Sequence, residues 1–281
     1  MSGPGQLAAD ATVKPDAGGH TQAAVGAPEI GNVSIRDLNH RFGSSVHAAA
    51  DVSLNFAPGE FVSIVGPSGC GKTTVLNLLA GLLEVQEGQV SIFGSPPKAG
   101  RHDVAYMLAR DCLFPWLTAE QNAEFGAQIR HADRQKRQKR ARALLEAVGL
   151  KGFENSYPKA LSHGMRQRVA LARTFCLDSP LLLMDEPFGA LDAQTKLQLE
   201  DVLLSLWTKE KRTVVFITHD LAEAITLSDR VIVMSARPGR VIADIPIELP
   251  RPRSVSALQK DPAYHKIYSH VWEKLEVGLQ S

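Results

Sequence analysis

The sequence GPSGCGKTT begins at Gly66 and places glycines, a lysine and two threonines at a spacing that suits phosphate binding. Gly66, Gly69 and Gly71 allow the backbone to curl so that its N–H groups point at a polyphosphate. Lys72 then reaches the β and γ phosphates of a nucleotide, and the hydroxyl of Thr73 binds Mg²⁺. The residues expected to contact the nucleotide are Gly66, Pro67, Ser68, Gly69, Cys70, Gly71, Lys72, Thr73 and Thr74.

A strand and a helix are expected on either side of this loop. The apolar run Phe61–Val65 reads as a buried strand, and residues Thr74–Leu83 read as a helix whose N-terminus would face the anion. A structural turn with a chance lysine is the alternative interpretation. The flanking elements favour the phosphate loop, because the motif requires a glycine-rich turn between a strand and a helix.

An acidic pair follows the four apolar residues Leu181–Met184. A strand that is buried on both faces has such a composition, and open α/β sheets bind ligands at the carboxyl ends of their strands. Asp185 would then hold Mg²⁺, and Glu186 would polarise a water molecule for attack on a phosphate. The alternative is a surface turn that happens to carry two acids.

A third motif, LSHGM, completes a set by which the chain resembles the nucleotide-binding subunit of ATP-binding cassette transporters over about residues 30–250. Ser162 and Gly164 match the family's signature sequence, whereas His163 and Met165 depart from it. Ser162 can cap a helix that starts near Met165, and the free N–H groups of such a helix end suit a γ-phosphate. The resemblance implies that this phosphate belongs to ATP bound by a second copy, so that two copies enclose two ATP molecules head to tail.

Three further residues match motifs of this family. His219, in TVVFITHD, falls where the family has a histidine that contacts the γ-phosphate. Asp192, in GALD, falls in the loop that communicates across the dimer. Phe42 falls where an aromatic residue stacks on adenine, although a phenylalanine is more often part of a core. The resemblance implies that Glu186 and His219 are catalytic and that Phe42 and Asp192 belong to the nucleotide site.

One position departs from the family where a functional glutamine is usual. The family has this glutamine after its third core strand, where it contacts Mg²⁺ or the attacking water and links the site to the membrane subunit. In VAYMLARDCLFPW the matching residue is Ala109, which has no polar side chain. Arg110 could reach a phosphate and Asp111 could hydrogen-bond a water molecule, and the spacing does not choose between them.

The composition is that of an ordinary globular protein. Of its 281 residues, 44% are hydrophobic and 22% are charged, and the net charge of +1 argues against a protein that coats nucleic acid. The three cysteines form no C-x-x-C pair, so neither a disulfide framework nor a zinc site is expected, and a reducing cytosol fits. No stretch approaches the ~20 apolar residues of a transmembrane helix, so a pore would lie on other chains.

The expected fold is α/β: a P-loop nucleotide-binding domain with mixed sheets, an antiparallel β subdomain and an inserted helical subdomain. Residues 1–29, rich in Gly, Ala, Pro and Thr, are expected to form a disordered tail without the features of a secretion signal. The cassette domain would span 30–250 with its helical subdomain at about 113–177, and residues 251–281 would form a C-terminal helical extension. A basic run at 130–150 is interpreted as the solvated face of a helix, with binding of anionic lipid or nucleic acid as the alternative. The strands are expected near Val33 and at Phe61–Val65, Val90–Phe93, Val104–Leu108, Leu181–Met184, Val214–Thr218 and Val231–Met234.

Two segments indicate partners. In LFPWLTAEQN, Phe114 and Trp116 flank a proline. In importers of the family, the equivalent stretch lines the groove that receives a short helix of the membrane subunit. Packing inside the helical insert is the alternative. ELPRPR and an amphipathic helix near the C-terminus resemble the nitrate, sulfonate and taurine importer group. The apolar side of that helix is expected to carry Tyr264, Ile267, Tyr268, Val271 and Leu275.

The resemblance implies the ATP-hydrolysing motor subunit of a bacterial importer, which uses ATP and Mg²⁺ and lies peripherally at the cytoplasmic face of the inner membrane. Its implied partners are a second copy, transmembrane permease subunits and a periplasmic or lipid-anchored solute-binding protein, without nucleic acid. A soluble cassette ATPase that acts on nucleic acid or ribosomes is the alternative, and Ala109 alone suggests a third, a non-hydrolysing regulatory partner. The solute is not encoded in these motifs, because selectivity belongs to the permease and the binding protein.

Overall fold

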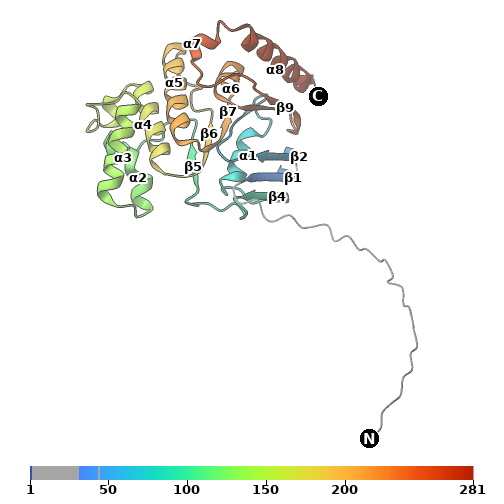
Figure 1. Cartoon of the computed structure of the whole chain (residues 1–281), viewed down its shortest axis with the longest axis horizontal. Helices are drawn as coiled ribbons and strands as arrows, with labels where there is room; N and C mark the ends of the chain where they lie inside the picture. The colour runs from blue at the N-terminus through green and yellow to red at the C-terminus, as the bar shows by residue number, and fades with distance from the viewer. Residues whose placement is uncertain (2–31, 44, 281) are drawn as a thin grey trace.

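The computed structural model describes residue 1, residues 32–43 and residues 45–280. The tail expected at 1–29 lies, apart from Met1, outside these described residues. Figure 1 shows two sheets with helices around them, and a lobe formed by α2, α3 and α4 on the side away from β1, β2 and β4. None of the helices within the described ranges is long and apolar enough to span a membrane.

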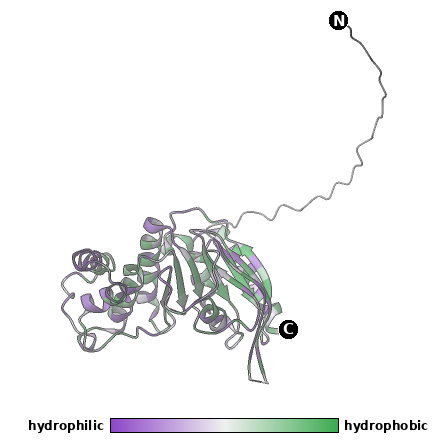
Figure 2. Cartoon of the chain, turned by 90° about the horizontal axis from the view of Figure 1, so that it is seen from below, coloured by the Kyte–Doolittle hydropathy of each residue, from purple (hydrophilic) through white to green (hydrophobic). Residues whose placement is uncertain are grey.

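A six-stranded sheet occupies the centre of the fold. Its strand order is β5-β6-β7-β3-β8-β9, with parallel pairing throughout except that β9 runs antiparallel to β8. Every residue of β3 and β7 is buried, as their continuous apolar sequences predict. Figure 2 shows these central strands in the green of hydrophobic residues. The strands are β3 (Phe61–Val65), β5 (Val104–Met107), β6 (Leu181–Asp185), β7 (Thr213–Ile217), β8 (Arg230–Met234) and β9 (Val241–Pro246).

A second sheet is antiparallel and confirms the expected β subdomain. Its order is β2-β1-β4, with bounds β1 (Val33–Phe42), β2 (Val46–Phe56) and β4 (Glu87–Ile92). The long strand β2, and β9 at the edge of the central sheet, are absent from the expected strands. From Ala50 to Phe56 the residues of β2 alternate between buried and exposed, with Val52, Leu54 and Phe56 buried, so the strand pattern is present in the sequence and is interrupted only by the buried alanines at 48–50.

The helix after the glycine loop is shifted from the expected Thr74–Leu83. It begins two residues earlier because Gly71, at φ 100°, turns the chain directly into it. It ends before Gly81, which has φ 69° and where an added Cβ would lie 2.4 Å from the carbonyl carbon of Lys98. The α-helices are α1 (Lys72–Leu79), α2 (Ala119–Ile129), α3 (Arg134–Ala147), α4 (His163–Cys176), α5 (Ala193–Glu210), α6 (Leu221–Leu227), α7 (Val255–Leu258) and α8 (Pro262–Gln280).

The basic run lies on α3, where part of its charge is paired. Ala141, Leu144 and Leu145 are buried, so this helix does turn an apolar side to the lobe. Three of its arginines form ion pairs with acids on α2 and α5. The pairs are Arg137 with Glu124 at 3.0 Å, Arg140 with Glu210 at 3.0 Å and Arg142 with Glu120 at 2.9 Å.

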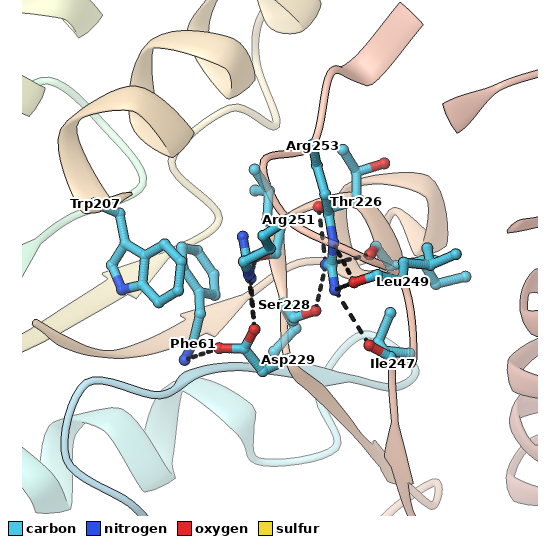
Figure 3. Close-up of polar contacts among 12 residues, drawn as sticks. Phe61, Trp207, Thr226, Ser228, Asp229, Ile247, Leu249, Arg251 and Arg253 are labelled. Carbon is cyan, nitrogen blue, oxygen red and sulfur yellow. Dashed lines mark hydrogen bonds and ion pairs between the residues drawn. The ribbon is translucent and has the colours of Figure 1, made fainter. Parts of the chain in front are cut away.

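The C-terminal segment is fastened to the sheet by two arginines (Figure 3). Arg251 pairs with Asp229 at 2.8 Å and lies over the Trp207 ring, 4.2 Å from its centroid. Arg253 donates to backbone carbonyls at the end of α6 and after β9, and burial lowers its pKa to about 10. The accepting carbonyls are those of Ile225, Thr226, Ser228, Ile247 and Leu249. The following α8 packs its expected apolar side on the core, with Tyr264 and Val271 buried and Ile267, Tyr268 and Leu275 beside them.

Candidate nucleotide-binding site

The predicted chemical groups meet at one edge of the six-stranded sheet. The glycine loop follows β3, the acidic pair ends β6, and His219 follows β7. Because β6, β7 and β3 are adjacent and parallel, their carboxyl ends lie side by side. This is the edge at which open α/β sheets bind ligands.

The glycine loop is closed on its own lysine. Lys72 is buried, and its Nζ donates to the carbonyl oxygens of Gly66 at 2.8 Å and Pro67 at 2.9 Å. Gly71 cannot carry a side chain, because a Cβ there would lie 2.3 Å from the carbonyl oxygen of Ala48. The loop therefore surrounds a fixed positive charge with backbone, a geometry that suits an anion.

Cys70 faces the core rather than the nucleotide. Its side chain is 1% exposed, and burial raises the pKa of its thiol. The sequence places Cys70 inside the loop, where a bulky group on sulfur would be expected to collide with a bound nucleotide. Because the sulfur is buried, a reagent could not reach it without opening the loop, and labelling is expected to be slow. Any contact of Cys70 with phosphate is through its backbone.

Thr73 and Asp185 form the pair expected for a metal. The Thr73 hydroxyl donates to Oδ1 of Asp185 at 3.2 Å, and burial raises the pKa of Asp185. Within the described ranges, no group of three or more His, Cys, Asp or Glu residues could hold a metal ion. A hydroxyl and a carboxylate suit Mg²⁺, which takes few protein ligands and completes its shell with phosphates and water.

Glu186 and His219 contact each other directly. Nδ1 of His219 lies 3.2 Å from Oε2 of Glu186, and both side chains are partly exposed. Glu186 has φ 43°, in the left-handed region, and its N–H donates to the carbonyl of Ile217 at 2.9 Å. An unusual backbone conformation held by a neighbouring strand is typical of functional positions. The Glu186 carboxylate thus lies just after the end of β6, beside His219.

A pocket of about 240 Å³ lies over this edge. Arg237 is the lining residue that sequence reasoning missed, and its Nε and Nη2 donate to the carbonyl of Gly69 at 3.1 and 3.0 Å. It brings a second positive charge to the phosphate loop. No motif marks Arg237, which lies 168 positions along the chain from Gly69. The pocket is lined by Ser68, Gly69, Gly71, Lys72, Thr73, Thr74, Glu186 and Arg237.

A larger pocket of about 670 Å³ lies at the opposite, amino ends of the strands. Its charged side chains are largely occupied with one another. Arg140 pairs with Glu210 at 3.0 Å, and Arg212 lies 3.3 Å from Asp178. Its size therefore does not make it the better candidate for a phosphate.

Four of the expected site residues do not line the pocket of their own chain: Phe42, Ser162, Gly164 and Asp192. Ser162 caps α4 by accepting the Met165 N–H at 3.2 Å, as expected, although the helix starts at His163. A Cβ on Gly164 would lie 2.7 Å from Cγ2 of Thr195 on α5. Asp192 caps α5, and Phe42, 44% exposed at the end of β1, makes an edge contact with the ring of His40.

The segment after β5 carries Arg110 and Asp111, between which the spacing does not choose. Arg110 is exposed. Asp111 accepts a hydrogen bond from Nε of Arg166 at 3.0 Å. Asp111, two residues after Ala109, therefore contacts helix α4.

The sequence profile described as ABC transporter matches residues 49–189. A putative ATP-binding protein of Brucella abortus is 45% identical over 240 residues, which cover 85% of this chain and 92% of that protein. The chain belongs to the ABC transporter family. The aliphatic sulfonates import ATP-binding protein SsuB of Bacillus cereus is 40% identical over 88% of this chain and 96% of its own length.

Solved structures agree with this membership. The ATP-binding cassette MJ0796, as a dimer in a post-hydrolysis state with ADP and Pi, superposes with a TM-score of 0.68 at 31% identity. The match covers 78% of this chain and all of that one. The cassette fold is therefore confirmed, and the chain is an ATPase of this family.

Proposed function

We propose that this chain is the ATP-hydrolysing motor subunit of a solute importer. The observation that carries the proposal is the convergence of three groups at one edge of the sheet: the closed phosphate loop, the Thr73–Asp185 pair and the Glu186–His219 pair, of which the loop, Thr73 and Glu186 line the pocket. Together they supply what phosphoryl transfer to water requires, namely positive charge on the phosphates, a metal position and a base for the water.

Each residue then has a distinct role in hydrolysis. Lys72 leaves its two carbonyl partners and binds the β and γ phosphates. Thr73 and Asp185 hold Mg²⁺, which when bound would neutralise part of the phosphate charge. Glu186 accepts the proton of the attacking water. His219, 3.2 Å from the Glu186 carboxylate, orients that carboxylate and contacts the γ-phosphate.

The signature residues serve a second copy. Ser162 and Asp192 cap helices and do not line the pocket of their own chain, which fits contact with ATP held by another subunit. Two head-to-tail copies would complete two sites, with Phe42 stacking on adenine. The solved structure of MJ0796 is dimeric, which supports the pairing of two copies.

The importer assignment rests on the relatives and on one exposed surface. The SsuB relative is an aliphatic sulfonates import protein, and we infer a sulfonate-, nitrate- or taurine-like solute here. Trp116 is 68% exposed and contacts Phe114, whose ring centroid lies 5.5 Å away. This aromatic pair suits docking of a permease helix at the cytoplasmic face of the plasma membrane. A solute-binding protein would complete the system.

A direct test uses purified chain and its genetic neighbours. The chain should release phosphate from ATP with Mg²⁺, and co-expression should recover a multi-span permease with it. Hydrolysis without permease recovery, but with recovery of RNA or ribosomes, would favour the alternative soluble ATPase. The net charge of +1 argues against that alternative.

A further inference from the structure

The loop after β5 is held against α4 by two arginines. Nε of Arg166 donates to Oδ2 of Asp111 at 3.0 Å, and the two side chains are 31% and 20% exposed. One face of the same helix also presents Arg173, two turns later, which donates to the backbone carbonyls of Cys112 at 2.8 Å and Asp111 at 2.6 Å. Two arginines that lie two turns apart on α4 therefore hydrogen-bond the adjacent loop residues Asp111 and Cys112.

Arg166 also holds both neighbours of the signature serine. Its Nη1 donates to the carbonyl of Leu161 at 2.9 Å, and its Nη2 lies 3.4 Å from Nδ1 of His163. Ser162, between them, caps α4. Because the guanidinium is planar and its donors point in fixed directions, a rotation that breaks one of these contacts strains the others.

We propose that Asp111 is a positioning residue for ATP hydrolysis. By orienting Arg166, it sets the place of Ser162 and the α4 N-terminus, and it makes closure on the second subunit's ATP depend on the loop after β5. The proposal rests on the proposed function, in which Ser162 contacts ATP of another copy. Ala109 offers this loop no polar side chain, and the charged contact two residues later links the loop to the signature instead.

The link can be broken without unfolding the lobe. Helix α4 is anchored separately by apolar residues such as Val169, Leu171 and Phe175, all fully buried. Asp111→Asn keeps the shape of the side chain and removes its charge. Asp111→Glu keeps the charge. Glu124→Gln is the matched control, because Glu124 pairs with Arg137 at 3.0 Å between α2 and α3 in the same lobe.

The test separates binding, assembly and turnover. Calorimetry measures ATP binding to the single subunit, size-exclusion chromatography measures the ATP-dependent dimer in a Glu186→Gln background, and phosphate release gives kcat and KM. We expect Asp111→Asn to lower kcat about two- to thirtyfold, the range for residues that couple two sites, and to weaken the dimer. Subunit affinity for ATP should not change. Asp111→Glu should restore part of kcat, and Glu124→Gln should affect only thermal stability.

The proposal is overturned if Asp111→Asn keeps wild-type kcat and dimerisation. It is also overturned if Glu124→Gln lowers kcat and dimerisation as much as Asp111→Asn does. It is equally overturned if the loss lies wholly in ATP affinity of the subunit. Failure of the proposed two-copy arrangement would look different, since the unaltered chain would then form no ATP-dependent dimer even in the Glu186→Gln background. Should Asp111→Asn fold poorly, Arg166→Lys removes the planar donor set while keeping the charge, and the same outcomes apply.

Discussion

Replacing Glu186 with glutamine isolates the proton-accepting role of this side chain. The substitution keeps size and shape, and the new amide can still hydrogen-bond His219 across 3.2 Å. The left-handed backbone at this position is held by the bond to Ile217 and is not altered. Asp185 and Thr73, which would hold the metal, are also left in place. What is lost is the carboxylate that accepts a proton.

We therefore expect the loss to appear in turnover and not in binding. A positioned general base contributes about 10²–10⁴-fold, so Glu186→Gln should lower kcat by about 10² or more, equivalent to about 2.7 kcal/mol in the activation barrier. ATP should still bind, since the phosphate loop is untouched, and the ATP-bound dimer should accumulate. Phosphate release, calorimetry and size-exclusion chromatography measure the three quantities.

The control is Glu84→Gln, an equally conservative change at an exposed position between α1 and β4. It should leave turnover unchanged. Wild-type turnover in Glu186→Gln would remove this residue from the mechanism. Loss of ATP affinity together with turnover would show that the carboxylate supports the site and not the chemistry.

Four other substitutions test the remaining geometry. Lys72→Ala should weaken ATP binding by about 1.5–3 kcal/mol, because it deletes a charged donor to phosphate, and unchanged calorimetry would contradict the loop assignment. Maleimide should label exposed Cys112 rapidly and buried Cys70 slowly, so Cys112→Ser should remove the fast phase in mass spectrometry. Burial and neighbouring acids raise the pKa of Glu200 from 4.5 to about 8. Between these two pH values the Glu200 carboxyl is protonated in the folded protein but ionised in the unfolded chain. Stability should then fall as pH rises toward 8, and Glu200→Gln should raise the melting temperature by an amount that grows over that window. Arg253→Met should destabilise the fold by about 2–3 kcal/mol in thermal or denaturant unfolding, because carbonyls at the end of α6 lose a charged donor, and an unchanged melting temperature would refute that role.

The sequence was sufficient for the five parallel strands of the central sheet and for the groups at its edge, whereas the antiparallel edge strand β9 was not expected. Continuous apolar runs mark strands buried on both faces, and parallel strands bring their carboxyl ends together, so Lys72, Asp185 and His219 had to approach one another. The same reasoning fails for β2, which has no continuous apolar run because Val52, Leu54 and Phe56 alternate with polar residues. A helix boundary such as Lys72 depends on a single φ angle at Gly71, which residue types do not specify.

Contacts between distant segments were not predictable from the sequence. Arg237 reaches the phosphate loop because β8 lies beside β3, and only the strand order reveals this neighbour. The orientation of Cys70 is decided by packing, since a loop residue can turn its side chain to either side. Asp111 has a carboxylate that could bind water, a metal or an arginine, and α4 supplies the arginine.

The caps on α4 and α5 differ in what they leave for a second copy's nucleotide. The Ser162 oxygen accepts the Met165 N–H, but its own hydroxyl hydrogen remains free to donate to a phosphate oxygen. Asp192 is different, because the hydrogen bonds from Thr195 lower its pKa and keep it charged. A carboxylate has no hydrogen to donate and would repel phosphate. In the proposed dimer Ser162 therefore contacts the γ-phosphate itself, whereas Asp192 acts on protein groups or water across the interface.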